Sequence, residues 1–121
     1  MSNEVSGLVR ARHPAQGEKD AASYFAESMP EQQLQQLIRG RALELGWLFY
    51  HTKDSRRSDG GFPDCVMLRS PRLVIAELKR ENGQLTDGQK AWLKAFEETG
   101  GETYEWRPSD WYSGVIEEVL R

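Results

Sequence analysis

The stretch GFPDCVMLRSPRLVIAELK, residues 61–79, decides the fold, because it encodes two strands and the turn between them. Apolar runs lie on both sides of Ser70-Pro71, and we expect strands from about 64 to 68 and from 72 to 79. Each run is apolar at odd and at even positions, which is typical of a sheet that helices cover on both sides. The stretch therefore predicts a central hairpin in an α/β fold.

A helix and a strand are expected before this hairpin. Ser28 and Glu31 match a capping box, and apolar residues then recur at helical spacing, so we predict a helix over 30–45 that Gly46 ends. The aromatic segment 47–51 has the composition of a strand, and a polar loop connects it to the hairpin.

The chain after the hairpin continues as helix, strand and helix. Thr86 and Gln89 match a second capping box, which predicts a helix that ends near Gly100. The segment 103–107 has a strand pattern, and 110–120 has the pattern of one closing helix. The predicted order is therefore αβββαβα.

Length and composition fit one globular domain of 121 residues with an apolar share of 38%. The polar segment 1–22 shows no apolar period, so we expect a flexible N-terminal tail before a domain over 23–121. No apolar run approaches the ~20 residues that span a bilayer, and we expect a cytoplasmic protein without membrane contact. The single cysteine, Cys65, excludes an internal disulfide and a zinc cluster, and we expect it to be a buried apolar residue.

Basic residues are concentrated in one part of a chain whose net charge is −3. The segment 53–80 carries more bases than acids, whereas 81–121 carries more acids than bases. Clustered bases favour contact with phosphate groups. The bases of this segment are Lys53, Arg56, Arg57, Arg69, Arg72, Lys79 and Arg80. A solvated loop of mixed charge stays open as the alternative for Arg56 and Arg57.

Two carboxylates and a lysine gather at one end of the predicted hairpin. Alternation along a strand places Glu77 and Lys79 on one face. A turn that is symmetric about Ser70-Pro71 puts Asp64 directly across from Glu77, whereas a one-residue asymmetry would put it on the opposite face.

Facing carboxylates repel each other unless a positive charge lies between them or one of them is protonated. All-oxygen ligation suits Mg²⁺ or Mn²⁺, which keep positions open for water and for a phosphate oxygen. Such an ion could activate a water that attacks phosphorus, and Lys79 could orient that water and add positive charge. The pattern Glu-x-Lys alone is more often a surface ion pair; its combination with Gly-Phe-Pro-Asp favours a functional site.

The motifs Gly61-Phe62-Pro63-Asp64, Val74-Ile75-Ala76-Glu77-Leu78-Lys79-Arg80, Leu85-Thr86 and Gln89-x-x-Trp92-Leu93, followed by Gly100-Gly101 and Arg107-Pro108, resemble the virus-type replication-repair nuclease (VRR-NUC) family. That family belongs to the PD-(D/E)XK nuclease superfamily, and the resemblance covers about residues 31 to 108. It implies a restriction-endonuclease-like αβββαβα core with a mixed central sheet flanked by helices. It also implies a Mg²⁺- or Mn²⁺-dependent deoxyribonuclease.

The resemblance assigns roles to individual residues. It implies Asp64 and Glu77 as metal ligands and catalytic residues, and Lys79 as the catalytic lysine. It implies the carbonyl of Leu78 as a further ligand and Gln89 as a residue that supports the site. Glu31 matches a metal-binding glutamate at the start of the family's first helix, although it could instead only complete the capping box with Ser28.

The expected partner is DNA, which Lys53, Arg56, Arg57 and Arg80 would grip through backbone phosphates. Small stand-alone relatives resemble structure-selective enzymes on branched DNA such as Holliday junctions. A homodimer is expected, because a symmetric junction needs paired cuts. DNA repair in a bacterial or phage-infected host cell is the expected setting.

The alternatives are a catalytically inactive nucleic-acid-binding module of the same fold and a protein-interaction adaptor. Neither explains two acids beside a basic segment. His51 could approach a phosphate, but a lone histidine at a strand end is more often a packing residue.

Overall fold

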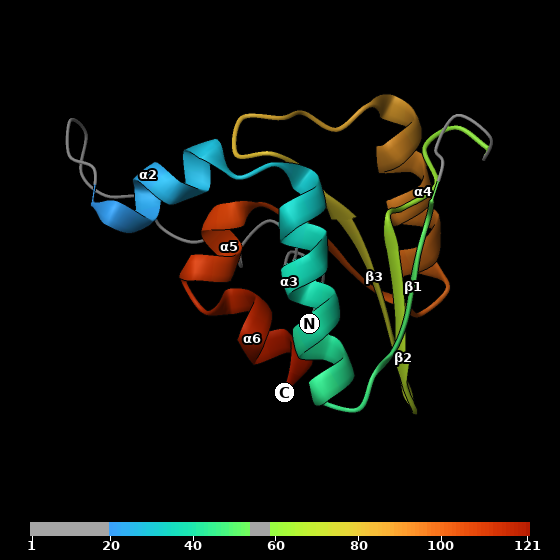
Figure 1. Ribbon diagram of the computed structural model, residues 1–121. Helices are drawn as coiled ribbons and strands as arrows, with labels where there is room; N and C mark the ends of the chain where they lie inside the picture. The colour runs from blue at the N-terminus through green and yellow to red at the C-terminus, as the bar shows by residue number, and fades with distance from the viewer. Residues whose placement is uncertain (1–19, 54–58) are drawn as a thin grey trace.

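A computed structural model describes residues 20–53 and 59–121 (Figure 1). Most of the expected tail, residues 1–22, lies outside these ranges, and the division of the chain at residue 22 stays a prediction. The elements are α2 (Ala21–Ser28), α3 (Glu31–Glu44), β1 (Leu48–His51), β2 (Cys65–Arg69), β3 (Arg72–Leu78), α4 (Asp87–Glu98), β4 (Glu102–Trp106), α5 (Pro108–Tyr112) and α6 (Val115–Leu120). None of these helices is long and apolar enough to cross a membrane.

The sheet has the strand order β1-β2-β3-β4 and mixed direction. The pairs β1–β2 and β2–β3 are antiparallel, and β3 and β4 run parallel. Cys65 faces Ala76, and Arg69 faces Arg72 next to the turn, so the hairpin has the symmetric register that the sequence predicts. The mixed sheet with flanking helices confirms the predicted fold class.

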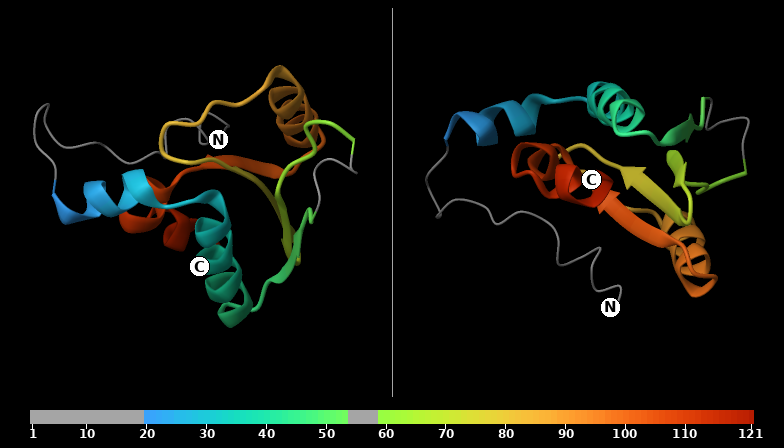
Figure 2. Two further views of the ribbon diagram at one scale, coloured as in Figure 1. Left: turned by 45° about the horizontal axis from the view of Figure 1, so that its top comes forward. Right: turned by 90° about the horizontal axis from the view of Figure 1, so that it is seen from below.

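The main core lies on one face of the sheet, beneath α3, α5 and α6 (Figure 2). Leu34 and Ile38 of α3 pack there with Met67, Val74 and Ile116, and all five are fully buried. Burial of side chains of this size stabilises a fold by about 1.5–3 kcal/mol each. This face therefore fixes how β2 and β3 sit against α3.

The opposite face of the sheet is covered by α4, which lies against β3 and β4 (Figure 2). The apolar side chains of this helix are at most half-buried. Trp92 and Phe96 contact Phe62 edge-on, whereas Ala91 and Ala95 are exposed. The aromatic contacts attach the chain segment before β2 to α4.

An apolar strip stays exposed where α4 does not reach, so helical cover on both sides is confirmed for β3 and β4 but not for β1. The strip consists of Leu48, Tyr50 and Leu68, which are 71%, 61% and 45% exposed. Leu48 pairs with Leu68 and Tyr50 with Val66, so these side chains share one face of the sheet.

The start of the first predicted helix was wrong in one respect. Ser28 does not cap α3; it is the last residue of α2, and its hydroxyl donates to carbonyls of its own last turn. Pro30 is the N-cap of α3 and has no side-chain cap bond. The helix α2 was missed because it packs through only a few residues, with Ala26 and Met29 buried.

The predicted single helix over 110–120 is wrong, because two short helices, α5 and α6, occupy this part of the chain. Gly114 has φ 89°, in the left-handed region that glycine adopts readily, and the chain changes direction there. The amphipathic pattern continues across the break, so periodicity alone does not reveal it.

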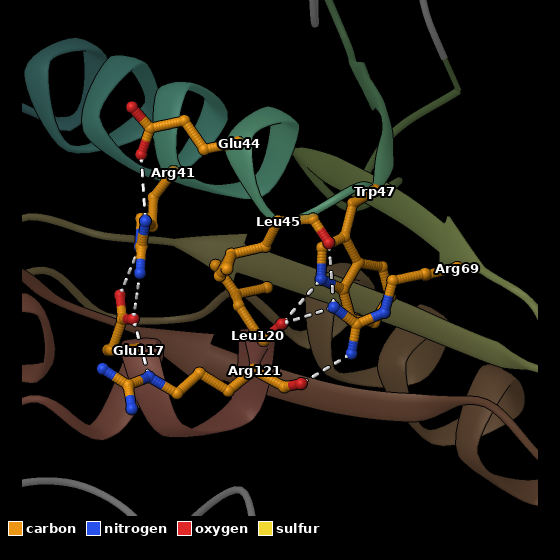
Figure 3. A network of polar contacts seen from close by, with 8 residues as sticks. All are labelled: Arg41, Glu44, Leu45, Trp47, Arg69, Glu117, Leu120 and Arg121. Atoms are coloured by element: carbon orange, nitrogen blue, oxygen red, sulfur yellow. Dashed lines mark hydrogen bonds and ion pairs between the residues drawn. The ribbon is translucent and has the colours of Figure 1, made fainter.

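Arg69 of β2 ties the ends of two helices to the sheet (Figure 3). Its guanidinium donates to the carbonyls of Leu45, Leu120 and Arg121 at 2.9, 3.0 and 2.7 Å, and lies 4.6 Å from the ring centre of Trp47. The indole of Trp47 also donates to Leu120, at 2.8 Å. These bonds satisfy carbonyls that helix ends leave without partners.

Candidate active site

The hairpin register brings the two predicted acids together. Because Cys65 faces Ala76, the next pair outward along the hairpin is Asp64 and Glu77. The alternative of an asymmetric turn is excluded. Glu77 is 2% exposed, and Asp64 is half-buried just before the first residue of β2.

The backbone of Leu78 anchors Asp64. One oxygen of the Asp64 carboxylate accepts a hydrogen bond from the Leu78 N–H at 2.8 Å. The N–H and C=O of one strand residue point toward the same neighbouring strand. The carbonyl of Leu78 therefore lies on the side of Asp64, as a ligand of a shared ion would.

Lys79 lies beside the acids. Its amine is 3.8 Å from Glu77, and its side chain is 14% exposed. The backbone N–H of Lys79 donates to the carbonyl of Trp106 at 3.0 Å, which continues the β3–β4 ladder to this residue. The lysine is thus fixed at its backbone and carries a largely buried positive charge.

The surroundings of Glu77 do not offset the cost of burying its ionised carboxylate next to Asp64. Burial and the adjacent carboxylate of Asp64 raise the pKa of Glu77 to about 8, although Lys79 acts in the opposite direction. The Oε1 atom of Glu77 is buried and has no hydrogen-bond partner among the described residues. A buried acceptor without a partner costs about 1–3 kcal/mol or more.

Glu31, the first residue of α3, reaches the same group of charges. Burial and the charge of Asp64 raise its pKa, whereas Lys79, Arg80 and the backbone N–H of Arg80 lower it. These influences reach Glu31 from Asp64, Lys79 and Arg80, but among the described residues its carboxylate does not join the two acids in a group that could hold one ion. Its side chain stays more exposed than that of Glu77.

The donor set fits a hard divalent cation. An ion would give the orphaned Oε1 of Glu77 a partner and would remove its repulsion with Asp64. Among residues 20–53 and 59–121, no three His, Cys, Asp or Glu side chains stand close enough to hold an ion together. Backbone and water oxygens would therefore complete the coordination, which is usual for Mg²⁺.

Gln89 takes part in the predicted capping box of α4. Its side-chain carbonyl accepts from the Thr86 N–H at 2.9 Å, and its own N–H donates to the Thr86 hydroxyl at 3.1 Å. A Cβ on Gly61 would lie 2.9 Å from the backbone nitrogen of Gln89, so the segment before Asp64 touches the start of α4. The carbonyl oxygen of Gln89 is thus engaged, and its role in the site stays a prediction.

The basic residues predicted to bind DNA are only partly described. Lys53 and Arg80 are exposed at the surface. Arg56 and Arg57 lie outside the described residues.

The remaining histidine, tryptophan and cysteine side chains among the described residues pack against other residues of the fold. His51 is half-buried, with its ring 6.4 Å from that of Phe49. Trp106 is fully buried, and Trp111 packs against the core. Cys65 is fully buried, and burial raises the pKa of its thiol, as expected for an inert packing residue.

Two residues that border the site, Gly83 and Arg107, were not expected there from the sequence. Gly83 packs against the side chain of Lys79, and Arg107 donates to the carbonyl of Gly83. The Arg107-Pro108 motif was the available signal. Its contact with the loop after β3 depends on the parallel pairing of β3 and β4, which motifs do not specify.

Comparison with known proteins agrees with this architecture. The family model of the VRR-NUC domain matches residues 8–109. A solved structure described as a VRR-NUC domain has 24% sequence identity and a TM-score of 0.59, over 72% of this chain and 94% of that one, which shows a shared fold. No curated protein matches the chain. A family match over most of the sequence, on a sheet that joins Asp64, Glu77 and Lys79, identifies the chain as a member of the VRR-NUC family of nuclease domains.

Proposed function

We propose that the chain is a metal-dependent nuclease that hydrolyses phosphodiester bonds of DNA, with Mg²⁺ or Mn²⁺ as its cofactor. The observation that carries this proposal is the buried, unpartnered Oε1 of Glu77 opposite Asp64. A structural role alone does not account for it, because an apolar residue at this strand position would avoid the cost of a buried polar atom that lacks a hydrogen-bond partner.

Asp64, Glu77 and the carbonyl of Leu78 would hold the cation, and Glu31 would approach it from α3. When bound, a divalent cation activates water and offsets the negative charge that builds on the phosphate. The N–H of Leu78 holds the Asp64 carboxylate at 2.8 Å, which fixes its orientation before any ligand arrives.

Lys79 contributes a positive charge and hydrogen-bond donors. Its ammonium group would donate to the attacking water or to a phosphate oxygen, at the point where the transition state gains negative charge. Gln89 would act from α4 through its amide nitrogen, since its carbonyl oxygen accepts from Thr86.

Exposed basic side chains near the site would bind the DNA backbone. Lys53 and Arg80 are exposed, and Arg56 and Arg57 belong to the same expected group. Phosphate contacts position nucleic acid without reading its sequence. We therefore expect selectivity to depend on the structure of the DNA.

Branched DNA such as a Holliday junction is the proposed substrate, and a homodimer is the proposed assembly. A two-fold symmetric junction offers two equivalent cleavage points, which two copies of one chain can reach together. The apolar strip of Leu48, Tyr50 and Leu68 supports association, because apolar side chains are rarely left exposed together at the edge of a sheet, here on β1 and the adjacent β2.

The alternative function is a nucleic-acid-binding module without catalysis. It needs no buried carboxylate pair beside phosphate. Retained DNA binding by a wild-type protein that fails to cleave any substrate with either metal ion would favour it.

The test of the proposed function is a cleavage assay on four-way junctions, flaps, nicked duplexes and linear DNA with Mg²⁺ or Mn²⁺. We expect Asp64→Asn, Glu77→Gln and Lys79→Met each to lower kcat by about 10²-fold or more while DNA binding persists. The matched controls are Glu98→Gln and Lys94→Met, because these residues form an exposed pair at 3.9 Å, close to the 3.8 Å of Lys79 and Glu77. Cleavage by Glu77→Gln at the rate of Glu98→Gln would contradict the proposal.

A further inference from the structure

The loop between β3 and α4 folds back onto the side chain of Lys79. Gly83 closes a turn in this loop, with its N–H donating to the Arg80 carbonyl at 2.9 Å. A Cβ built on Gly83 would lie 3.3 Å from Cδ and 3.4 Å from Cβ of Lys79. The backbone of Gly83 therefore packs directly on the aliphatic part of the lysine side chain.

Arg107, at the end of β4, holds Gly83 in this place. The residue is 8% exposed, and its guanidinium donates to the Gly83 carbonyl while it pairs with Glu105. A second bond fastens the same loop, since the N–H of Ser109 donates to the carboxylate of Glu81 at 3.0 Å. The loop is thus attached to the junction of β4 and α5 at two points.

Glu77 alone does not direct the amine of Lys79. The 3.8 Å that separate the Lys79 amine from Glu77 exceed the usual length of a hydrogen bond, about 2.7–3.2 Å, so the attraction has little directionality. A lysine side chain has several rotatable bonds and loses up to about 2 kcal/mol of rotamer entropy when it is fixed. Packing along its aliphatic part must supply the restriction.

We propose that Arg107 and Gly83 are positioning residues that set where the amine of Lys79 lies. Arg107 fixes the carbonyl of Gly83, and the backbone of Gly83 then limits the rotamers of Lys79. The inference rests on the proposed function for its effect on cleavage, although the packing itself does not depend on that function.

The first test is Gly83→Ala. The backbone of Gly83 is outside the left-handed region, so alanine fits its conformation, and the added methyl group would push the side chain of Lys79 by a few tenths of an ångström. We expect kcat to fall by about 10-fold, because a misplacement of about 1 Å costs up to about 100-fold and the shift here is smaller. KM, DNA affinity and the unfolding midpoint should stay near wild type. Gly40→Ala is the matched control, because no atom lies within 4 Å of its added Cβ.

A double-mutant cycle separates positioning from a general defect. In a Lys79→Met background, Gly83→Ala should change kcat by less than twofold, since the amine that it misplaces is already gone. An equal loss of kcat in both backgrounds would overturn the proposal.

Arg107→Lys tests the other positioning residue. Lysine keeps the charge but lacks the forked guanidinium that reaches Glu105 and Gly83 together. We expect kcat to fall with KM unchanged. Arg72→Lys is its control, because Arg72 pairs with Glu102 at the far end of β3.

A readout independent of cleavage distinguishes this inference from the proposed function. In protein made with ¹³C-lysine, the side-chain resonances of Lys79 can be assigned from their loss in Lys79→Arg. These resonances should shift in Gly83→Ala and Arg107→Lys but not in Gly40→Ala, even if the wild-type chain cleaves no DNA. Unchanged Lys79 resonances in Gly83→Ala would refute the positioning role.

Discussion

Glu77 occupies a strand position between Ala76 and Leu78, both of which point into the core, while its own carboxylate faces Asp64. Its pKa in the folded chain is about 8, above the ordinary value of 4.5, chiefly because of burial and then because of Asp64. The metal-free folded protein therefore binds a proton at Glu77 more tightly than the unfolded chain does. A raised carboxyl pKa stabilises the fold below the ordinary value and loses this effect as the pH rises through the folded value.

The free energy of unfolding of the metal-free protein should fall as the pH rises from about 4.5 to about 8. Denaturant unfolding in EDTA at several pH values measures it. Glu77→Gln should flatten the slope in this window, whereas Glu98→Gln, on the surface of α4, should leave it as in wild type. Added Mn²⁺ should also reduce the slope, because a bound cation keeps Glu77 ionised. A wild-type slope that Glu77→Gln leaves unchanged would show that another group titrates.

At the scale of elements, the start of α4 and the segment before β2 meet through their backbones. Gly61 has φ 86°, and a Cβ at this position would lie 2.6 Å from the carbonyl carbon of Gly88. The indole of Trp92 donates to the carbonyl of Gly60 at 3.1 Å, and its ring contacts Phe62. The contact thus places the residues that lead into Asp64 against α4.

Gly61→Ala should destabilise the protein by about 2 kcal/mol or more, through left-handed strain and a backbone collision together. Gly114→Ala separates the two causes, because Gly114 has φ 89° and open space around it. In this control, strain alone should lower the free energy of unfolding by only about 1 kcal/mol. Denaturant unfolding measures both, and equal losses would show that the contact between Gly61 and Gly88 contributes nothing. Cleavage should fall in Gly61→Ala alone.

Local sequence predicted the elements that local interactions determine. The register of β2 and β3 follows from the turn at Ser70-Pro71, and Thr86 with Gln89 marks the start of α4, so both were predicted correctly. The helix α2 was not predicted because it packs against α5, which is distant in the sequence. The break at Gly114 was not predicted because the apolar pattern continues across it, although glycine adopts its φ of 89° readily.

The same distinction holds for the candidate site. Asp64, Glu77 and Lys79 belong to one hairpin, and alternation along its strands was enough to bring them together. Gly83 and Arg107 meet only after β4 has paired with β3 in parallel, so no local pattern could reveal their contact.

At the scale of the whole molecule, the apolar strip of Leu48, Tyr50 and Leu68 lies on the side of the sheet that carries Asp64 and Glu77. Among the strands of residues 20–53 and 59–121, β1 lies at an edge of the sheet, where its outward backbone groups could pair with another strand. Two copies that meet at this edge would place both sites on a common side.

Tyr50→Lys should convert the proposed homodimer into a monomer, because a charged residue on an exposed edge strand opposes pairing. Light scattering coupled to size-exclusion chromatography measures the mass, and Tyr112→Lys, at an exposed tyrosine of α5, is the control. The monomer should cut one strand of a four-way junction but lose paired cutting. A wild-type protein that is monomeric at all concentrations would refute the assembly.

The hydrogen bonds that Arg69 and Trp47 donate to the end of α6 should slow the exchange of its amide hydrogens. A helix of six residues hardly forms alone, and so short a helix would ordinarily exchange its amide hydrogens through local opening. Here the carbonyl of Leu120 accepts from both Trp47 and Arg69, and Glu117 is held by Arg41. The amide of Glu118 should therefore exchange as slowly as those of β3, and Trp47→Phe should make its exchange fast while β3 stays protected. The last helix would then open only together with the sheet, as part of one cooperative unit.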